Sequence, residues 1–233
     1  FNRDMALPQE VIDDITAQGG IAGGGKVYGR TSAVQEFVDE DYYRSIWSKW
    51  NSPEDLDLLV ENMERSDSGK LVDTAQLYGM ERFALDILSV LEGDLSKLYE
   101  PGSRSIAAVY FEDDYGKPEM NSHWARLGDT VTLRYVEEFE YYNPLTGEVY
   151  EGGIPEDEPW CARAVSYRDI DYEVAALVSV PSTLSYRYYG SDEFVLNDQT
   201  FIQDTGTDSV MLYAFDAADD GADSAMESFL ADY

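Results

Sequence analysis

The chain has very little of the chemistry on which most metal sites and nucleophilic enzymes depend. Its 233 residues include one cysteine, Cys161, and one histidine, His123. A single cysteine excludes an intramolecular disulfide and every metal site built from several cysteines. A thiolate nucleophile would need His123 as its base, and we expect instead a buried, inert Cys161 thiol. The compartment stays open, because a cysteine-poor chain fits both the cytosol and the outside of a Gram-positive cell.

Basic residues are also scarce. The chain has 16 Lys and Arg residues against 47 Asp and Glu residues, which gives a net charge of -31. Binding a phosphate backbone depends on clustered Lys and Arg, so nucleic acid is excluded as a partner. The 44% of apolar residues and 13% of aromatic residues are enough for a folded core. The acidity therefore belongs to the solvated surface of one large domain or two small ones.

Long hydrophobic runs are missing as well. The longest uncharged run covers residues 174–186, only 13 residues with Pro181 among them, whereas a spanning helix needs about 20 apolar residues. The chain starts at Phe1 without an initiator methionine or a charged and apolar leader. We therefore expect a piece of a longer protein, without a membrane span of its own.

A glycine-rich segment has the spacing of a phosphate-binding loop. It runs from Gly20 to Lys26, but Val27 stands where a Ser or Thr would bind magnesium. It also follows a predicted helix and precedes a predicted strand, the reverse of the order that such a loop needs. We interpret it as a flexible exit from the helix and predict no ATP site in this chain.

An acidic segment near the end is a weak candidate for a calcium loop. Asp216, Asp220 and Glu227 occupy positions 1, 5 and 12 of such a loop, whereas Ala218 at position 3 removes one ligand. A strand, and no entering helix, is predicted before Asp216. We favour the interpretation that the neighbouring carboxylates, such as that of Asp219, cap a helix N-terminus.

No arrangement of residues predicts an enzyme. The chain has neither a Gly-x-Ser-x-Gly elbow nor a His-Glu-x-x-His motif. Carboxylate pairs such as Glu137 with Glu138, or Asp169 with Asp171, could serve glycoside hydrolysis. Among 47 acidic residues, however, such pairs arise by chance. We therefore predict no catalytic residue, no cofactor and no established metal ligand.

The periodicity of apolar residues differs between the two ends of the chain and its middle. At the two ends, helix signals alternate with strand signals, and the middle alternates with a period of two. We predict helices that begin at Leu7 and Ser52 and another over residues 224–230, with strands at residues 26–29, 70–78 and 209–215. In the middle we predict strands at residues 105–111, 130–139, 162–167 and 172–180, and a protruding acidic, tyrosine-rich hairpin within residues 140–159. The predicted fold class is α+β: a discontinuous α/β subdomain (residues 1–79 plus 207–233) with an inserted β-rich subdomain (residues 80–206).

Several short sequence motifs follow one another in an order that resembles the order in a known family. They are Leu91-Glu92-Gly93-Asp94, then Gly128-Asp129-Thr130-Val131-Thr132-Leu133, then the strand from Tyr172 that contains Glu173-Val174 and Leu177-Val178. Further agreement comes from the opening helix that ends in Gly19-Gly20, from residues 72–79 and from the final residues 226–233. In this order the chain resembles the extracytoplasmic, MacB-like periplasmic core domain of FtsX-like ABC transporter permeases, across nearly its whole length. Residues 121–126 and 140–159 depart from the family pattern.

The resemblance implies a non-catalytic domain on the extracytoplasmic side of a cell membrane, in a Gram-positive-type bacterium. There it would couple ATP-driven motion of membrane helices to export or release of a peptide, lipoprotein or drug. The implied partners are the membrane helices of the same permease, a cytoplasmic ABC ATPase that uses the ATP, and a second permease in a dimer. A free-standing secreted ligand-binding or adhesion module is the alternative.

Overall fold

The computed structural model describes residues 6–30, 34–112, 115, 117–151, 153–154, 157–179 and 192–232. The predicted strand end at Val180, the phrase through Pro181, the opening Phe1 and the closing Tyr233 lie outside these residues. The described part is an α+β fold with six α-helices and one ten-stranded mixed sheet. The helices are α1 (Gln9–Ala17), α2 (Glu40–Trp47), α3 (Pro53–Asn62), α4 (Arg82–Asp86), α5 (Asp198–Thr205) and α6 (Asp220–Asp232), with a 3-10 helix η1 (Leu95–Leu98). The strands are β1 (Ile21–Arg30), β2 (Val34–Val38), β3 (Leu71–Thr74), β4 (Gln76–Met80), β5 (Ser89–Gly93), β6 (Ser105–Val109), β7 (Thr130–Tyr142), β8 (Cys161–Ser179), β9 (Glu193–Asn197) and β10 (Val210–Ala217).

The sheet joins parts of the chain that are far apart in sequence. Its strand order is β10-β1-β4-β9-β6-β8-β7-β2-β3, and β5 pairs with β8 outside this path. The pairs β4 with β9 and β6 with β8 are parallel, and the other pairs are antiparallel. The sheet is continuous across the predicted subdomain boundaries, since β2 and β3 follow β7 at one end. The division into two subdomains stays a prediction.

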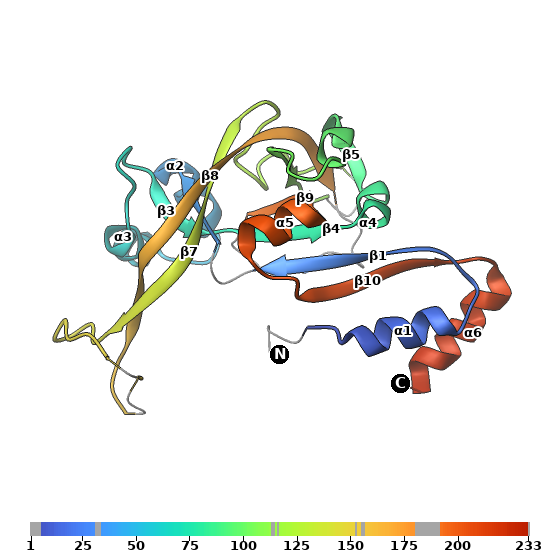
Figure 1. Cartoon of the computed structure of the whole chain (residues 1–233). Helices are drawn as coiled ribbons and strands as arrows, with labels where there is room; N and C mark the ends of the chain where they lie inside the picture. The colour runs from blue at the N-terminus through green and yellow to red at the C-terminus, as the bar shows by residue number, and fades with distance from the viewer. Residues whose placement is uncertain are drawn as a thin grey trace.

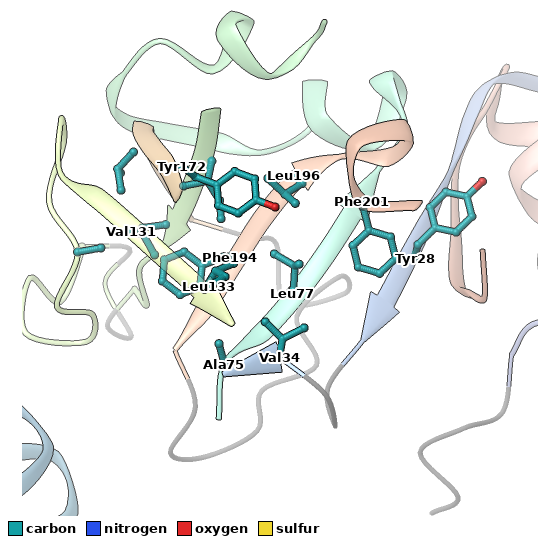
Figure 2. Close-up of a cluster of buried hydrophobic side chains, with 14 of the residues drawn as sticks. Tyr28, Val34, Ala75, Leu77, Val131, Leu133, Tyr172, Phe194, Leu196 and Phe201 are labelled. Carbon is teal, nitrogen blue, oxygen red and sulfur yellow. The ribbon is translucent and has the colours of Figure 1, made fainter. Parts of the chain in front are cut away.

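The centre of the sheet is buried on both faces. On one face lies a cluster that includes Leu77, Leu133, Phe194 and Phe201 (Figure 2). Neighbouring positions such as Val195 join a second cluster that packs under α4 and η1. Strands covered on both sides are apolar at successive positions. This is why β6 and β9 do not show the period of two that we predicted for the middle of the chain.

The helices form where the start signals lie. Ser52 caps α3, because its side chain accepts a hydrogen bond from the amide of Asp55, and Pro53 occupies the first helical position. Leu56 and Val60 of this helix pack with α2 and β3 in a third apolar cluster. The predicted helix start at Ser52 is therefore confirmed, whereas α2 and α5 were not predicted.

The first and last elements of the fold lie together at one edge of the sheet. Strands β1 and β10 pair in antiparallel fashion from Ile21 opposite Ala217 to Tyr28 opposite Val210. The amide of Ala218 donates to the carbonyl of Gly20 over 2.6 Å. The start of α6 lies next to Gly20, which follows α1, since a Cβ atom at Gly20 would lie 2.6 Å from that of Ala222 (Figure 1). These contacts hold the two ends of the described chain together.

Strands β7 and β8 form a long arm that projects from the body (Figure 1). Their register runs from Thr130 opposite Glu173 to Tyr142 opposite Cys161. Beyond them, the amide of Asn143 donates to the carbonyl of Glu148, which closes the predicted turn at residues 143–147. The protruding hairpin is thus the tip of this arm. The two strands predicted at residues 162–167 and 172–180 are one strand, β8, through its described end.

The glycine-rich segment after α1 corrects one of our predictions. Residues 21–30 form strand β1, so Gly23, Gly24 and Gly25 lie in a sheet and not in a flexible helix exit. A Cβ atom at Gly24 would lie 2.3 Å from the hydroxyl oxygen of Tyr213, on the neighbouring strand. The glycines are there because the side chains of adjacent elements occupy the space above them.

Candidate functional surfaces

A groove with a volume of about 460 Å³ lies where the arm leaves the body. Its floor comes from β2, β7 and β8, and one wall comes from the turn between α3 and β3. The lining residues are Phe37, Glu64, Arg65, Ser66, Asp67, Ser68, Lys70, Trp124, Thr130, Thr132, Arg134, Tyr167 and Asp169. Three bases and three acids line it, so the groove is electrically balanced in a strongly acidic chain.

Arg134 holds the floor of the groove together. Its guanidinium pairs with the carboxylate of Asp169 directly across the strand pair, with Nε 3.0 Å from Oδ1. The same group is 3.2 Å from Glu64 and stacks over the ring of Tyr167 at 3.7 Å. The side chain is only 8% exposed. Its hydrogen bonds to Asp169 raise the pKa of Arg134 against the opposing effect of its burial. The charge is therefore already neutralised before any ligand arrives.

The other two bases of the groove are also engaged. Arg65 donates to Glu40 over 2.7 Å and to the carbonyl of Gly69 over 3.2 Å. The ammonium of Lys70 lies 5.6 Å from the ring centre of Trp124 and 3.8 Å from Asp39. Such an arrangement can receive polar groups.

Behind Trp124 lies a buried polar cluster that joins four segments of the chain. Glu36 of β2 is fully buried and accepts a hydrogen bond from the indole nitrogen of Trp124 over 2.5 Å. Asp192, just before β9, accepts one from the hydroxyl of Tyr42 over 2.8 Å. The other carboxyl oxygen of Glu36 has no hydrogen-bond partner among the described residues.

The environment of this cluster shifts its proton equilibria in opposite directions. Burial, and then the charge of Asp192, raises the pKa of Glu36 well above its ordinary value near 4.5. Burial also raises the pKa of Asp73 to about 6 and lowers the pKa of His123. Glu36 is therefore neutral over much of the acidic range, and His123 is a neutral imidazole. These shifts follow from burial, which disfavours the charged form of each group.

The structure separates the residues that a thiol enzyme would need. Cys161 is exposed near the outer end of the arm, which contradicts our expectation of a buried thiol. The reason is that β8 begins at Cys161, in the outer part of the arm, away from the apolar clusters of the core. His123 is fully buried and stacks on Tyr110 with 5.6 Å between ring centres. The two residues therefore belong to different parts of the fold.

The acidic pairs weighed for glycoside hydrolysis have structural partners. Asp169 pairs with Arg134 as described, and Asp171 accepts a hydrogen bond from Thr132 over 2.6 Å. Glu137 lies 3.9 Å from Arg168, and Glu138 lies opposite Ser166 on the arm. None of these pairs lines a closed cleft together.

The candidate calcium residues fall on two elements. Asp216 belongs to β10, whereas Asp220 and Glu227 belong to α6. Asp219 accepts a hydrogen bond from the amide of Ala222 over 2.9 Å, as expected for a carboxylate at a helix start. Within the ranges that the structure describes, no group of three or more His, Cys, Asp and Glu side chains could hold a metal ion. The calcium loop stays a prediction that the fold gives no reason to strengthen.

Sequence reasoning missed the groove and the buried cluster. Their residues come from β2, the turn after α3, residue 124, the arm and residue 192, which no local pattern connects. Glu36 stands in an alternating strand, where the sequence pattern of a buried glutamate is the same as that of an exposed one.

None of the helices in the described part is long and apolar enough to cross a membrane.

The fold is thus an α+β domain whose first and last elements share one edge and whose long hairpin projects from the body. No family model matches the chain, and no curated protein matches it. The structure matches the extracellular domain of the noncanonic ABC-type transporter YknZ from Gram-positive bacteria, with 9% identity and a TM-score of 0.43, over 95% of this chain and 78% of that chain. It also matches the periplasmic region of MacB from Actinobacillus actinomycetemcomitans, with 12% identity and a TM-score of 0.44, over 99% of this chain and 76% of that chain.

Proposed function

We propose that this chain is the extracytoplasmic domain of an FtsX-like, MacB-type ABC transporter permease. The observation that carries the proposal is the pairing of β1 with β10, which brings the first and last elements to one edge of the sheet. A domain inserted between two membrane helices needs its two connections on the same side. The ordered phrases of the sequence, from Leu91 to Val178, support the same family.

In this role the domain would work as a mechanical element. Motion of the membrane helices would enter through α1 and α6 and pass to β1 and β10. From there the continuous sheet, which is packed on both faces at its centre, would carry the motion to the arm. Close-packed interiors transmit displacement with little loss. ATP would be hydrolysed by a separate cytoplasmic ATPase, as the family resemblance implies.

The location can be tested with the chain's single cysteine. Cys161 is exposed on the arm, so a membrane-impermeant maleimide should label it in intact cells that express the full-length protein, with its other cysteines replaced. We expect the same labelling in intact and permeabilised cells, and none for Cys161→Ser. Labelling that requires permeabilisation would contradict the proposal. The full-length gene product should also show a hydrophobic span before Phe1 and three or more spans after Tyr233.

The secreted ligand-binding or adhesion module is the second candidate. The observation that favours it is the polar groove between the arm and the turn at residues 64–70. The same labelling experiment separates the two candidates, because a free-standing secreted module would leave the cell and carry its label into the medium. A label retained in the membrane fraction supports the permease.

A further inference from the structure

The outer half of the arm exposes one apolar face. Phe139 lies directly opposite Ala164, and Tyr141 lies opposite Ala162. Directly opposed residues share a face of the strand pair, and so do residues two apart on one strand. The ring of Trp160 lies 5.8 Å from that of Tyr141, edge to face. We call these five residues the arm face.

No other named strand of the described chain pairs with the arm beside the arm face. Strand β2 pairs with β7 only up to Tyr135, and β5 and β6 pair with β8 only from Glu173 onward. The side chain of Trp160 is 52% exposed and that of Tyr141 is 39% exposed. A two-stranded ribbon is marginally stable by itself in water. Contiguous exposed aromatic residues on such a ribbon mark an interaction surface.

Most of the charged residues in the outer arm are acidic. Residues 137–168 include eight acidic and two basic residues. The two bases are engaged locally, since Arg163 donates to Glu140 over 2.7 Å and Arg168 lies 3.9 Å from Glu137. Among the described residues, Glu148, Glu151 and Asp157 form no ion pair. These three carboxylates, which we call the acidic rim, lie in the segment that joins β7 to β8, and no described base neutralises their charge.

We infer that the arm face is a docking site for a basic polypeptide segment that carries apolar side chains. Its apolar residues would cover Tyr141 and Trp160, and its Lys and Arg residues would meet the free carboxylates of the rim. A second copy of the chain would bring another net charge of -31 to the same surface, and an anionic membrane would be repelled likewise. The inference rests on the proposed function only for the compartment in which the partner would be found.

The test uses the whole chain and a defined probe. The probe is a fluorescein-labelled 18-residue peptide of lysine and leucine, followed by fluorescence anisotropy at physiological salt. The double substitution Tyr141→Ser and Trp160→Ser leaves the net charge unchanged and should weaken binding about tenfold or more. The matched control is Trp50→Ser with Leu58→Ser, which removes exposed apolar residues from another surface. This control should leave the affinity within about twofold.

The acidic rim has its own matched pair of variants. Glu148→Gln with Glu151→Gln and Asp157→Asn should weaken binding and flatten its salt dependence. Glu10→Gln with Glu54→Gln and Glu61→Gln removes the same charge from exposed positions on α1 and α3, and should have a smaller effect. Circular dichroism would confirm that each variant is folded.

Four results would overturn the inference. The first is that the unchanged chain does not bind the peptide, and the second is that the arm and control variants lose equal affinity. The third is that the arm binds phosphatidylcholine or phosphatidylglycerol vesicles and not the peptide. The fourth is that the chain forms dimers through the arm in sedimentation experiments. The experiment uses the isolated chain, so its outcome does not depend on where the full-length protein lies. If the peptide does not bind, the maleimide test of the proposed function is unaffected. If the maleimide test contradicts the proposed function, the peptide-binding result is likewise unaffected.

Discussion

At the scale of single residues, Glu36 is a carboxyl group inside an apolar core. Its hydrogen bond to Trp124 holds one oxygen, while Asp192 and Asp73 face it as further acids and Tyr42 lies beside Asp192. The folded state therefore keeps the proton of Glu36 at pH values at which the unfolded chain has lost it. Stability from this proton is fully present below about pH 4.5, the ordinary value for a glutamate. It is lost as the pH rises through the raised pKa of the folded state.

Glu36→Gln should remove the part of this dependence that Glu36 contributes, while the raised pKa of Asp73, about 6, adds a part of the same sign in both proteins. Glutamine keeps an acceptor for Trp124 and cannot ionise, so the variant should be more stable than the parent at pH 8, by about 1 kcal/mol or more. Urea unfolding at pH 5 and pH 8 measures the difference. Glu61→Gln, at an exposed position on α3, is the control and should leave the pH dependence unchanged. A parent whose stability is flat between these pH values would contradict the assignment.

At the scale of elements, Asp204 ties the arm base to α5. Its side chain is 2% exposed and accepts hydrogen bonds from Arg104 over 2.5 Å and from Tyr172 over 2.7 Å. The hydroxyls of Tyr172 and Tyr135 also form a hydrogen bond with each other over 2.6 Å. Burial raises the pKa of both tyrosines, so they stay protonated and keep the network complete. The network joins β7, β8, α5 and Arg104, the residue just before β6, at one point.

Asp204→Ala should therefore cost more than loss of a surface pair. Removing the carboxylate leaves the buried hydroxyl of Tyr172 with Tyr135 as its partner, at a cost of about 1–3 kcal/mol, whereas the side chain of Arg104 is 48% exposed and can be hydrated instead. Glu173→Ala breaks the exposed pair with Lys97 and should cost about 0–1 kcal/mol. Chemical denaturation of both variants measures the free energies of unfolding. Equal losses would show that the network contributes no more than a surface contact.

The arm should open more readily than the sheet from which it grows. Near Val131 and Tyr172 the two strands are part of the core. Near Tyr141 and Ala162 they pair with each other and with the short segment at residues 149–150, and with no other named strand of the described chain. Ribbons of two strands are marginal in water, so their hydrogen bonds open locally. Hydrogen–deuterium exchange should be fastest at the arm tip and slowest at residues 131–136 and 170–178. Uniform protection along β7 and β8 would contradict this prediction, and would indicate that something covers the arm.

At the scale of the whole molecule, the net charge of -31 opposes compactness. Like charges repel more strongly in the folded state than in the expanded unfolded chain, and salt screens that repulsion over about 10 Å at 0.1 M. Sodium chloride should therefore raise the Tm of the chain between 0.01 M and 0.3 M. A Glu148→Lys and Glu151→Lys variant, with less net charge, should show a smaller increase. A Tm that falls with salt would mean that ion pairs, and not repulsion, dominate the electrostatics.

Local patterns were enough to predict several elements. Pro53 after Ser52 predicted the start of α3, the strand that opens with Gly128-Asp129 is β7, and the turn at residues 143–147 closes the arm as expected. Where the prediction was wrong, packing had overruled the pattern. Gly23 to Gly25 read as a loop by composition but lie in β1, because Phe83 and Tyr213 need the space that their missing side chains leave.

The sequence by itself determined an α+β chain with an acidic surface, its single cysteine and histidine, and the absence of recognisable catalytic motifs. Those features depend on composition and on residues close together in the chain. Only the tertiary structure decided that the chain ends pair at one edge, that Glu36 and Asp192 lie together in the core and that Tyr141 and Trp160 stay partly exposed on the arm. Each of these depends on contacts between strands that lie far apart in sequence, and the free energy of such contacts comes from burial that no local pattern records.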